Sequence, residues 1–170
     1  MIYALSGERP EIAAGVFLAP DAVVIGRVAI GQGSSIWFGT VLRGDVDRIT
    51  VGRETNIQDL SMVHCDADTP TVIGDRVTVG HRAILHGCRV EDECIIGMGA
   101  IIQNRAVIRR QVVVASGSVV REGFEAPERT LVVGVPAIVK RRLTDSEVDL
   151  IKHLAAVYAD RAKRYTAELG

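Results

Sequence analysis

Aliphatic residues recur at every sixth position along most of the chain. The positions that share this spacing fall into four runs: Leu18, Val24, Ile30, Ile36 and Leu42; Val51, Ile57 and Val63; Ile73, Val79 and Leu85; and Val90, Ile96, Ile102, Ile108, Val114 and Val120. An α-helical period of 3.6 cannot generate this pattern. We expect one aliphatic residue in six to point inward and stack on its equivalents. A glycine often follows it, and we expect this glycine to begin a tight turn that needs unusual φ and ψ angles.

Each six-residue repeat forms one flat side, and three sides close one triangular coil of about 18 residues. Successive coils stack at the strand spacing of ~4.8 Å. Ordinary antiparallel hairpins would place Asn-Gly or Asp-Gly turns between alternating runs, and the sequence has neither dipeptide. The pattern resembles the left-handed parallel β-helix family, and the handedness follows from that resemblance alone. The predicted fold class is therefore an all-β solenoid of hexapeptide repeats with a long C-terminal α-helix.

The register breaks at three places, and at the insertions we expect outward loops, which often carry function. Three extra residues lie between Leu42 and Val51, and four lie between Val63 and Ile73. One residue is missing between Leu85 and Val90.

The repeat is predicted to stop after Val120, with a loop at residues 122–127 and a turn at residues 134–137. Thr144 and Glu147 fit a capping box, and an apolar stripe at steps of three and four follows. We therefore divide the chain into a β-helix domain (residues 1–126), a connecting segment (127–143) and a C-terminal helix (144–170) that packs on the prism of its own chain or of a neighbour.

Composition narrows the function. The 170 residues carry a formal net charge of −1 and only 4% aromatic residues, which argues against a nucleic-acid binder. Three cysteines without framework spacing suggest reduced thiols. The N-terminus lacks a secretory pattern, and no apolar run approaches the ~18 residues of a membrane span. We expect a soluble cytoplasmic protein.

Two histidines occupy the same turn position in consecutive coils. His64 and His86 each follow an inward residue on one side of the prism, so their Cα atoms should be about one coil spacing apart. Such a pair suits a shared metal ion at ~2.0–2.1 Å. His81 belongs to another side, and a threefold assembly would bring it to the pair on a neighbouring chain. Three histidines with an open position are typical of catalytic zinc.

Each histidine alone is more often a surface or core residue than a ligand, but the aligned set favours a metal. His153 lies on the predicted helix and is interpreted as a solvent-side residue. Cys65 neighbours His64, but adjacent strand residues point to opposite faces, so we expect a core thiol. Cys88 and Cys94 are interpreted as structural too.

Several blocks, taken in order, resemble the gamma-class carbonic anhydrase family and its bacterial homologues over nearly the whole chain. They are Val41-Leu42-Arg43-Gly44-Asp45, Thr55-Asn56-Ile57-Gln58-Asp59, Val63-His64, Val79-Gly80-His81, Leu85-His86-Gly87-Cys88 and Ile96-Gly97-Met98-Gly99-Ala100. The resemblance implies a homotrimer of left-handed β-helices and reversible hydration of CO2 to bicarbonate by metal-bound hydroxide at the trimer interface. It implies zinc, with iron or cobalt as alternatives, held by His64 and His86 of one chain and His81 of the next.

The resemblance also implies roles for other side chains. Gln58 would orient the hydroxide or CO2, with Asn56 and Tyr158 nearby, and the interface residues would be Arg43, Asp45 and Asp59. The sequence departs from the family at Val46, where an acidic residue is usual, and in the short loop of residues 65–70, which lacks the proton-shuttle glutamate. Asp66 and Asp68 are candidate substitutes, although acidic residues in loops are more often simply solvated. Neither nucleic acid nor membrane is an expected partner.

Two other functions remain open. Hexapeptide-repeat acyltransferases use acyl-CoA and a single histidine base, and they need no metal. Lys140, Arg141 and Arg142 form a small basic cluster that could serve CoA phosphates, but charge flanking a helix is the simpler explanation. The third alternative is a metal-stabilised trimeric scaffold without hydratase activity.

Overall fold

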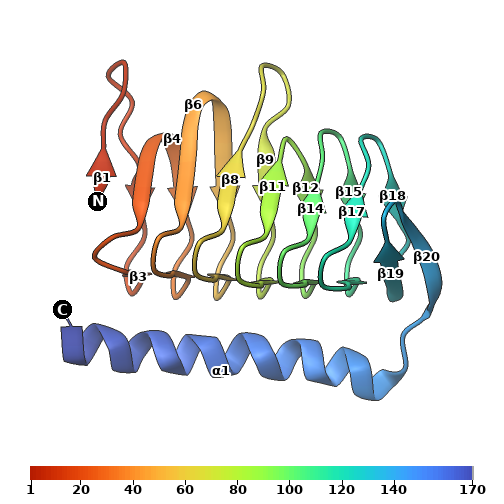
Figure 1. Ribbon diagram of the computed structural model, residues 1–170. Coiled ribbons are helices and arrows are strands. Elements are labelled where there is room, and N and C mark those ends of the chain that lie inside the picture. Colours follow the sequence, from red (N-terminus) through yellow and green to blue (C-terminus); the bar gives the residue numbers. More distant parts are fainter. Residues whose placement is uncertain (170) are drawn as a thin grey trace.

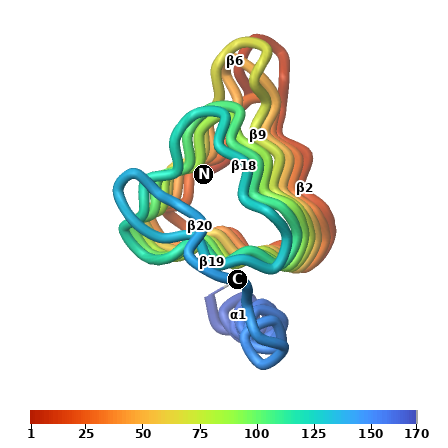
Figure 2. The backbone as a smooth tube through the Cα atoms, turned by 90° about the vertical axis from the view of Figure 1, so that its right-hand side faces the viewer, coloured from red at the N-terminus to blue at the C-terminus, as the bar shows by residue number. Residues whose placement is uncertain are grey.

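The computed structural model describes residues 1–169, and in it short parallel strands wind around a narrow core in coils of three flat faces. Viewed along the axis, the coils superimpose as a rounded triangle with a ridge at one corner (Figure 2). The fold is a left-handed parallel β-helix with one C-terminal helix, as the hexapeptide pattern and the family resemblance together predict. We name the three sides faces A, B and C.

The strands of face A form a sheet of their own, whereas two long strands, β4 (Val23–Ile30) and β6 (Val41–Val51), run through both face B and face C. Face A contains β3 (Phe17–Leu18), β5 (Ser35–Ile36), β7 (Asn56–Ile57), β10 (Thr78–Val79), β13 (Ile95–Ile96), β16 (Val113–Val114), β19 (Thr130–Gly134) and β20 (Ala137–Arg142). Face B contains β1 (Ile2–Tyr3), the first halves of β4 and β6, β8 (Met62–His64), β11 (Ile84–His86), β14 (Ile101–Ile102) and β17 (Val119–Val120). Face C contains β2 (Glu11–Ile12), the second halves of β4 and β6, β9 (Thr71–Ile73), β12 (Arg89–Val90), β15 (Val107–Ile108) and β18 (Glu125–Ala126).

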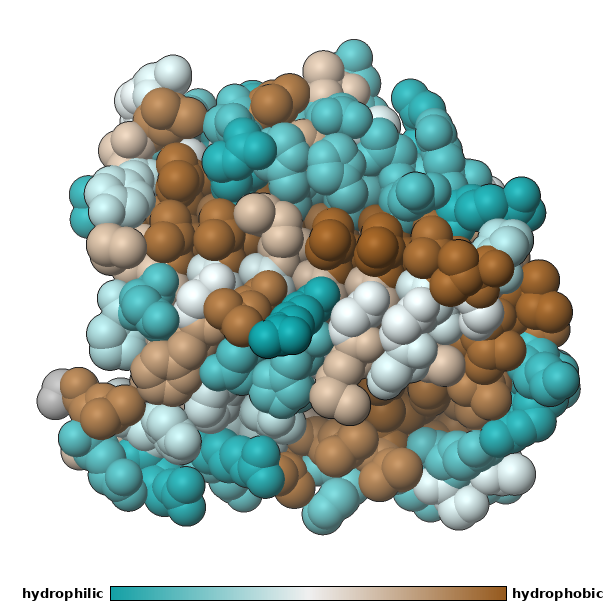
Figure 3. Space-filling view, in the orientation of Figure 1, coloured by the Kyte–Doolittle hydropathy of each residue, from teal (hydrophilic) through white to brown (hydrophobic). Residues whose placement is uncertain are grey.

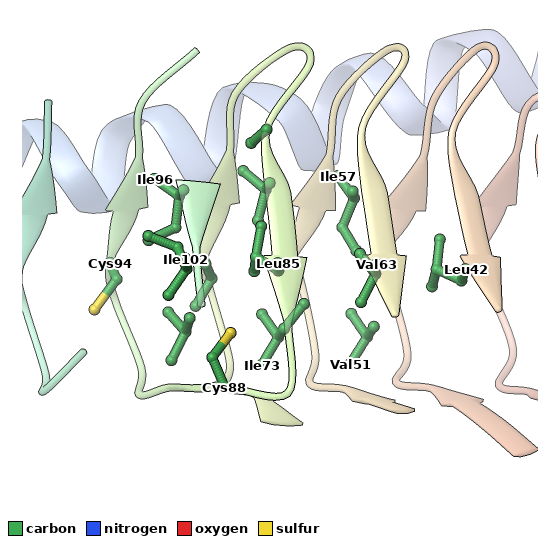
Figure 4. Packing of buried hydrophobic residues seen from close by; sticks show 14 of the residues in the cluster. Leu42, Val51, Ile57, Val63, Ile73, Leu85, Cys88, Cys94, Ile96 and Ile102 are labelled. Carbon is green, nitrogen blue, oxygen red and sulfur yellow. The ribbon is translucent and has the colours of Figure 1, made fainter. Parts of the chain in front are cut away.

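The inward residues stack as the spacing of six predicts. On face B, Leu42, Val63 and Leu85 are partners in register and are fully buried. Figure 4 shows them beside the equivalent residues of the other two faces. Each buried aliphatic side chain stabilises the fold by roughly 1.5–3 kcal/mol relative to an exposed one. Burial of these side chains is therefore the main force that holds successive coils together.

The structure needs the glycine after the inward residue for a different reason from the unusual φ and ψ angles that we expected from the sequence. Gly31, Gly52 and Gly74 have no positive φ. They lie one above another instead, and a Cβ on Gly52 would sit 2.5 Å from the backbone carbon of Gly74. The constraint there is close backbone approach, while the positive φ falls three residues after the inward residue, for example at Glu54 (φ 52°).

The insertions project from the corner between faces B and C as a ridge (Figure 2). Strand β6 crosses this corner as one long strand, and its register with β4 shifts between Gly26 and Val28. The second insertion is a tight loop closed by a bridge between Asp66 and Thr69. The two insertions therefore bulge outward, as predicted.

The repeat continues beyond the point at which it was predicted to stop. The loop expected at residues 122–127 contains β18, which pairs in parallel with β15, and β19 pairs in parallel with β16. Ala126 and Val132 extend the spacing of six from Val120 and are buried. The expectation failed because Ala126 is too small to stand out in the hydrophobic pattern. Strand β20 then returns antiparallel to β19 within the predicted connecting segment; the division into domains stays a prediction.

Helix α1 (Asp145–Leu169) runs back along face A of its own chain, against β3, β5, β7 and β10 (Figure 1). The capping box is present: the Glu147 amide donates to Oγ1 of Thr144, and the Thr144 amide donates to Oε2 of Glu147. Among residues 1–169, no helix combines the length and apolar character needed to cross a membrane. The cytoplasmic location stays a prediction.

Candidate metal centre

The hexapeptide register brings His64 and His86 together at the corner between faces B and C. His64 ends β8, His86 ends β11, and the two residues are partners in that parallel pair. Nδ1 of His64 lies 3.0 Å from Nε2 of His86. This stacked arrangement is the one that their equivalent positions in consecutive coils predict.

The outer nitrogen of each ring faces an acceptor. Nε2 of His64 lies 2.9 Å from Oδ1 of Asp45, and Nδ1 of His86 lies 2.7 Å from Oδ1 of Asn104. A carboxylate or an amide oxygen can only accept, so each of these outer nitrogens carries the proton. In the neutral rings, the inner nitrogens Nδ1 of His64 and Nε2 of His86 therefore present lone pairs to each other.

Two lone pairs at this separation repel unless a proton or a metal ion lies between them, and a metal ion can accept both lone pairs at once. Neutral imidazole nitrogens are good ligands of zinc and of other first-row metals. Metal-bound histidines also typically donate their other N–H to a carboxylate or carbonyl, as both rings do here. The donor set therefore fits a metal ion.

Asp45 is held ionised by its neighbours. Burial opposes ionisation, but the hydrogen bond from His64 and the charge of Arg43 outweigh it and lower the pKa of Asp45. Arg43 donates to Oδ2 of Asp45 within the same chain. The two residues thus form a pair that orients His64; their place at a subunit interface stays a prediction.

His81 lies at a different corner of the prism, between faces A and B. Its Nδ1 is 2.8 Å from Oδ2 of Asp59, and its side chain is 44% exposed. Across residues 1–169 of a single chain, no three His, Cys, Asp or Glu side chains are grouped so that they could hold a metal ion. One chain therefore offers two imidazoles at one corner and a third, similarly supported by a carboxylate, at another.

Gln58 and Asn56 form a buried amide pair next to Asp59. Nε2 of Gln58 donates to Oδ1 of Asn56, and Nδ2 of Asn56 donates to Oγ1 of Thr78, each at 3.0 Å. The amide nitrogen of Gln58 is thus engaged, which leaves its oxygen as the group able to accept from a ligand. Both residues lie on the His81 side of the prism.

Tyr158 packs in the aromatic contact between α1 and face A. Its ring meets Trp37 edge-on at 5.5 Å, and the guanidinium of Arg161 lies 5.0 Å from the ring centre. Burial raises the pKa of Tyr158; Arg161 lowers it, and the charge of Asp59 raises it. Tyr158 is therefore a partly buried residue that packs against the core, and a role in the site stays a prediction.

The cysteines are buried and free. Burial raises the pKa of Cys88 and of Cys94 to about 12, and that of Cys65 is raised as well. Thiols of this kind are inert. The expectation of core thiols is confirmed, since all three cysteines belong to the buried hydrophobic cluster.

Sequence reasoning missed Asn104. Oδ1 of Asn104 faces His86, and Nδ2 of Asn104 donates to Oδ2 of Asp66 at 2.8 Å. A signal was available, because the pairing of Leu85 with Ile102 places Asn104 beside Gly87 in the next coil. Asp66 was noticed only as a proton-shuttle candidate.

The outer side of face B carries an unpartnered apolar ladder between the two corners that bear histidines. Its members are in register from coil to coil: Val23, Val41, Met62, Ile84, Ile101 and Val119. Ile84 is 38% exposed, and Leu60 (56%) and Met98 (57%) extend the apolar surface at the neighbouring corner. Figure 3 shows an apolar row crossing this side of the molecule.

The comparisons with known proteins agree with the fold. Residues 70–104 match the family model "Hexapeptide repeat of succinyl-transferase". A carbonic anhydrase of Geobacillus kaustophilus is 41% identical over 98% of this chain and 92% of its own length. Gamma carbonic anhydrase 1, mitochondrial, of Arabidopsis thaliana is 47% identical over 95% of this chain. The chain spans about three fifths of the length of that protein and of its Arabidopsis paralogue.

Among solved structures, a hexapeptide transferase family protein from Anaplasma phagocytophilum superimposes with a TM-score of 0.94 at 40% identity, covering 96% of this chain and 97% of that one. Fold and repeat together thus define a hexapeptide-repeat left-handed β-helix protein. Within that class, the identity over nearly full length to the Geobacillus enzyme shows that the chain belongs to the gamma carbonic anhydrase family.

Proposed function

We propose that this protein is a metal-dependent carbonate dehydratase that hydrates CO2 reversibly to bicarbonate at a site shared between subunits of a homotrimer. The observation that carries the proposal is the His64–His86 pair, whose inner nitrogens face each other at 3.0 Å while Asp45 and Asn104 hold the outer ones. Membership of the gamma carbonic anhydrase family supports the choice of reaction.

In this proposal His64 and His86 of one chain and His81 of the next hold the metal, with zinc as the expected ion and iron or cobalt as alternatives. Zinc bound by three imidazoles lowers the pKa of a water molecule to about 7 and so supplies a nucleophile at neutral pH. Asp45, Asn104 and Asp59 fix the outer nitrogen of each ring, which keeps the rings in one orientation.

Two further groups act on the substrates. The free amide oxygen of Gln58, fixed by the hydrogen bond to Asn56, would orient the attacking oxygen by accepting its proton in a hydrogen bond. Hydration of CO2 also releases a proton that must reach bulk buffer. Oδ1 of Asp66 lies 4.0 Å from Nε2 of His86, and the Asp66 side chain is 60% exposed, so it offers a carboxylate between the site and solvent.

The apolar ladder on face B supports the trimer. It lies between the corner that carries His81 and the corner that carries His64 and His86, and an exposed apolar surface of this kind marks an interaction site. A threefold assembly that buries face B would bring His81 of one chain toward the histidine pair of the next.

An acyltransferase is the second candidate, favoured by the structural likeness to a hexapeptide transferase family protein. Such an enzyme needs one histidine base. The site instead holds two facing imidazoles, and three histidines each have a polar partner at one ring nitrogen. That redundancy favours a metal over a single base.

Stopped-flow CO2 hydration by zinc-loaded protein tests the proposal. We expect a rate above the buffer blank for the wild type, a rate at the blank for His86→Ala, and the wild-type rate for the control His153→Ala, because His153 lies exposed on α1. A wild-type rate equal to the blank would contradict hydratase activity. If zinc were still bound, the scaffold alternative would remain; acyl transfer from an acyl-CoA without metal would favour the transferase.

A further inference from the structure

We propose that Asn104 is a positioning residue for the metal centre, oriented by Asp66, and that it sets which nitrogen of His86 is free to bind a metal. This inference rests on the proposed function. It concerns two side chains at the corner between faces B and C that lie outside the three-histidine set.

The hydrogen-bond chain has one consistent direction. An ionised Asp66 can only accept, so it takes a hydrogen bond from Nδ2 of Asn104 at 2.8 Å and fixes the orientation of that amide. Oδ1 of Asn104 then faces Nδ1 of His86 at 2.7 Å and can only accept in turn. The proton of a neutral His86 is therefore held on Nδ1, which leaves the lone pair on Nε2, the nitrogen that faces His64.

Reversal of the amide would reverse the tautomer. With Nδ2 of Asn104 turned toward His86, Nδ1 would have to accept, and the proton would move to Nε2, where it would block ligation. Asp66 prevents this reversal. The loop of residues 66–69 is the inserted segment that places Asp66, since Thr69 closes it by donating twice to the Asp66 carbonyl oxygen.

The backbone makes room for Asn104 at one particular glycine. A Cβ on Gly87 would lie 2.2 Å from Oδ1 of Asn104 and 3.0 Å from its Cγ, and the φ of Gly87 is +54°. The next coil is tied to the same point by the Arg105 amide, which donates to the Gly87 carbonyl at 2.7 Å. The Asn104 side chain thus reaches His86 through space that any other residue at position 87 would fill.

The first test is cobalt affinity, measured by visible absorption during titration of the metal-free full chain with Co2+. Asn104→Leu should weaken binding by roughly tenfold to a hundredfold, the usual effect of losing such a partner. The control Gln103→Leu removes a neighbouring amide whose oxygen accepts from the Glu122 backbone, and it should leave affinity unchanged. The double substitution Asp66→Asn/Asn104→Asp keeps the net charge and again puts an acceptor against Nδ1, so it should restore most of the affinity.

The second test is independent of metal. Long-range proton–nitrogen NMR of the metal-free wild type should show the His86 proton on Nδ1, and Asn104→Leu should give a mixture of tautomers. A proton on Nε2 in the wild type, or unchanged cobalt affinity in Asn104→Leu, would overturn the inference. A wild type with the expected tautomer that binds no Co2+ would defeat the proposed function and leave the positioning of His86 intact.

Discussion

At Gly52, glycine after the inward aliphatic residue is required by the close approach of the next coil. At Gly52 a methyl group would meet the Gly74 carbonyl carbon and oxygen at 2.5 Å and the Asp75 carboxylate at 2.4 Å. Backbone atoms of a stacked coil cannot give way as a flexible side chain can. The same requirement acts at Gly31 and Gly97.

Gly52→Ala should therefore lower the free energy of unfolding by about 1–3 kcal/mol, the usual cost of overpacking. Urea unfolding checks this, with Gly117→Asn as the control. A Cβ on Gly117 would meet no atom within 4 Å, and the φ of +69° is one that Asn tolerates. Equal stability of the two variants would show that coil contact does not impose the glycine.

The positions of individual residues could be predicted from the sequence where they belong to the six-residue repeat. The inward positions and the His64–His86 stacking follow from a spacing of six alone, since one register fixes every coil. Asn104 was not predictable in this way, because its role depends on the direction of two side-chain hydrogen bonds. Tyr158 illustrates the same limit, since its contact with Trp37 depends on where α1 docks.

At the scale of elements, a charged ladder joins coils at the corner between faces C and A. Glu93 is only 5% exposed, and its carboxylate accepts from side chains of the coils on both sides, Arg76 at 3.2 Å and Arg110 at 3.1 Å, and from Gln111 at 2.7 Å. Burial opposes ionisation of Glu93, but these hydrogen bonds and the arginine charges lower its pKa.

A carboxyl group with a lowered pKa stabilises the fold above its unfolded value of 4.5, and this contribution is lost as the pH falls through the folded value. Glu93→Gln should therefore cost about 1.5–3 kcal/mol at pH 7, and the difference from wild type should shrink below about pH 4.5. Urea unfolding at several pH values and one protein concentration measures it. The exposed Glu128→Gln is the control, and a difference that stays constant with pH would contradict the account.

Helices and strands could be predicted from the sequence where their hydrophobic pattern is strong, and were missed where it is weak. The capping box and apolar stripe located α1 well, but the sequence left open whether the helix lies on its own chain. The strands β18 and β19 were missed because small Ala126 weakened the repeat, although the register continues through both.

At the scale of the whole molecule, the prism separates two groups of histidines. The His64–His86 pair and the His81–Asp59 pair lie at opposite edges of face B, and the apolar ladder lies between them. No fold of a single hexapeptide prism brings these edges together, because side chains fill its interior. In the proposed function, completion of the site therefore depends on association of chains, a step that the sequence of one chain indicates only through the exposed ladder and the position of His81.

Metal content of mixed trimers tests this sharing most directly. Chains with His81→Ala keep the histidine pair, and chains with His64→Ala keep His81, so neither alone should retain zinc after gel filtration, provided no polyhistidine tag is present. In a mixed trimer, one junction always joins an intact pair to an intact His81. The account predicts one zinc ion in every mixed trimer and none in either parent; mixed trimers as free of zinc as their parents would contradict it.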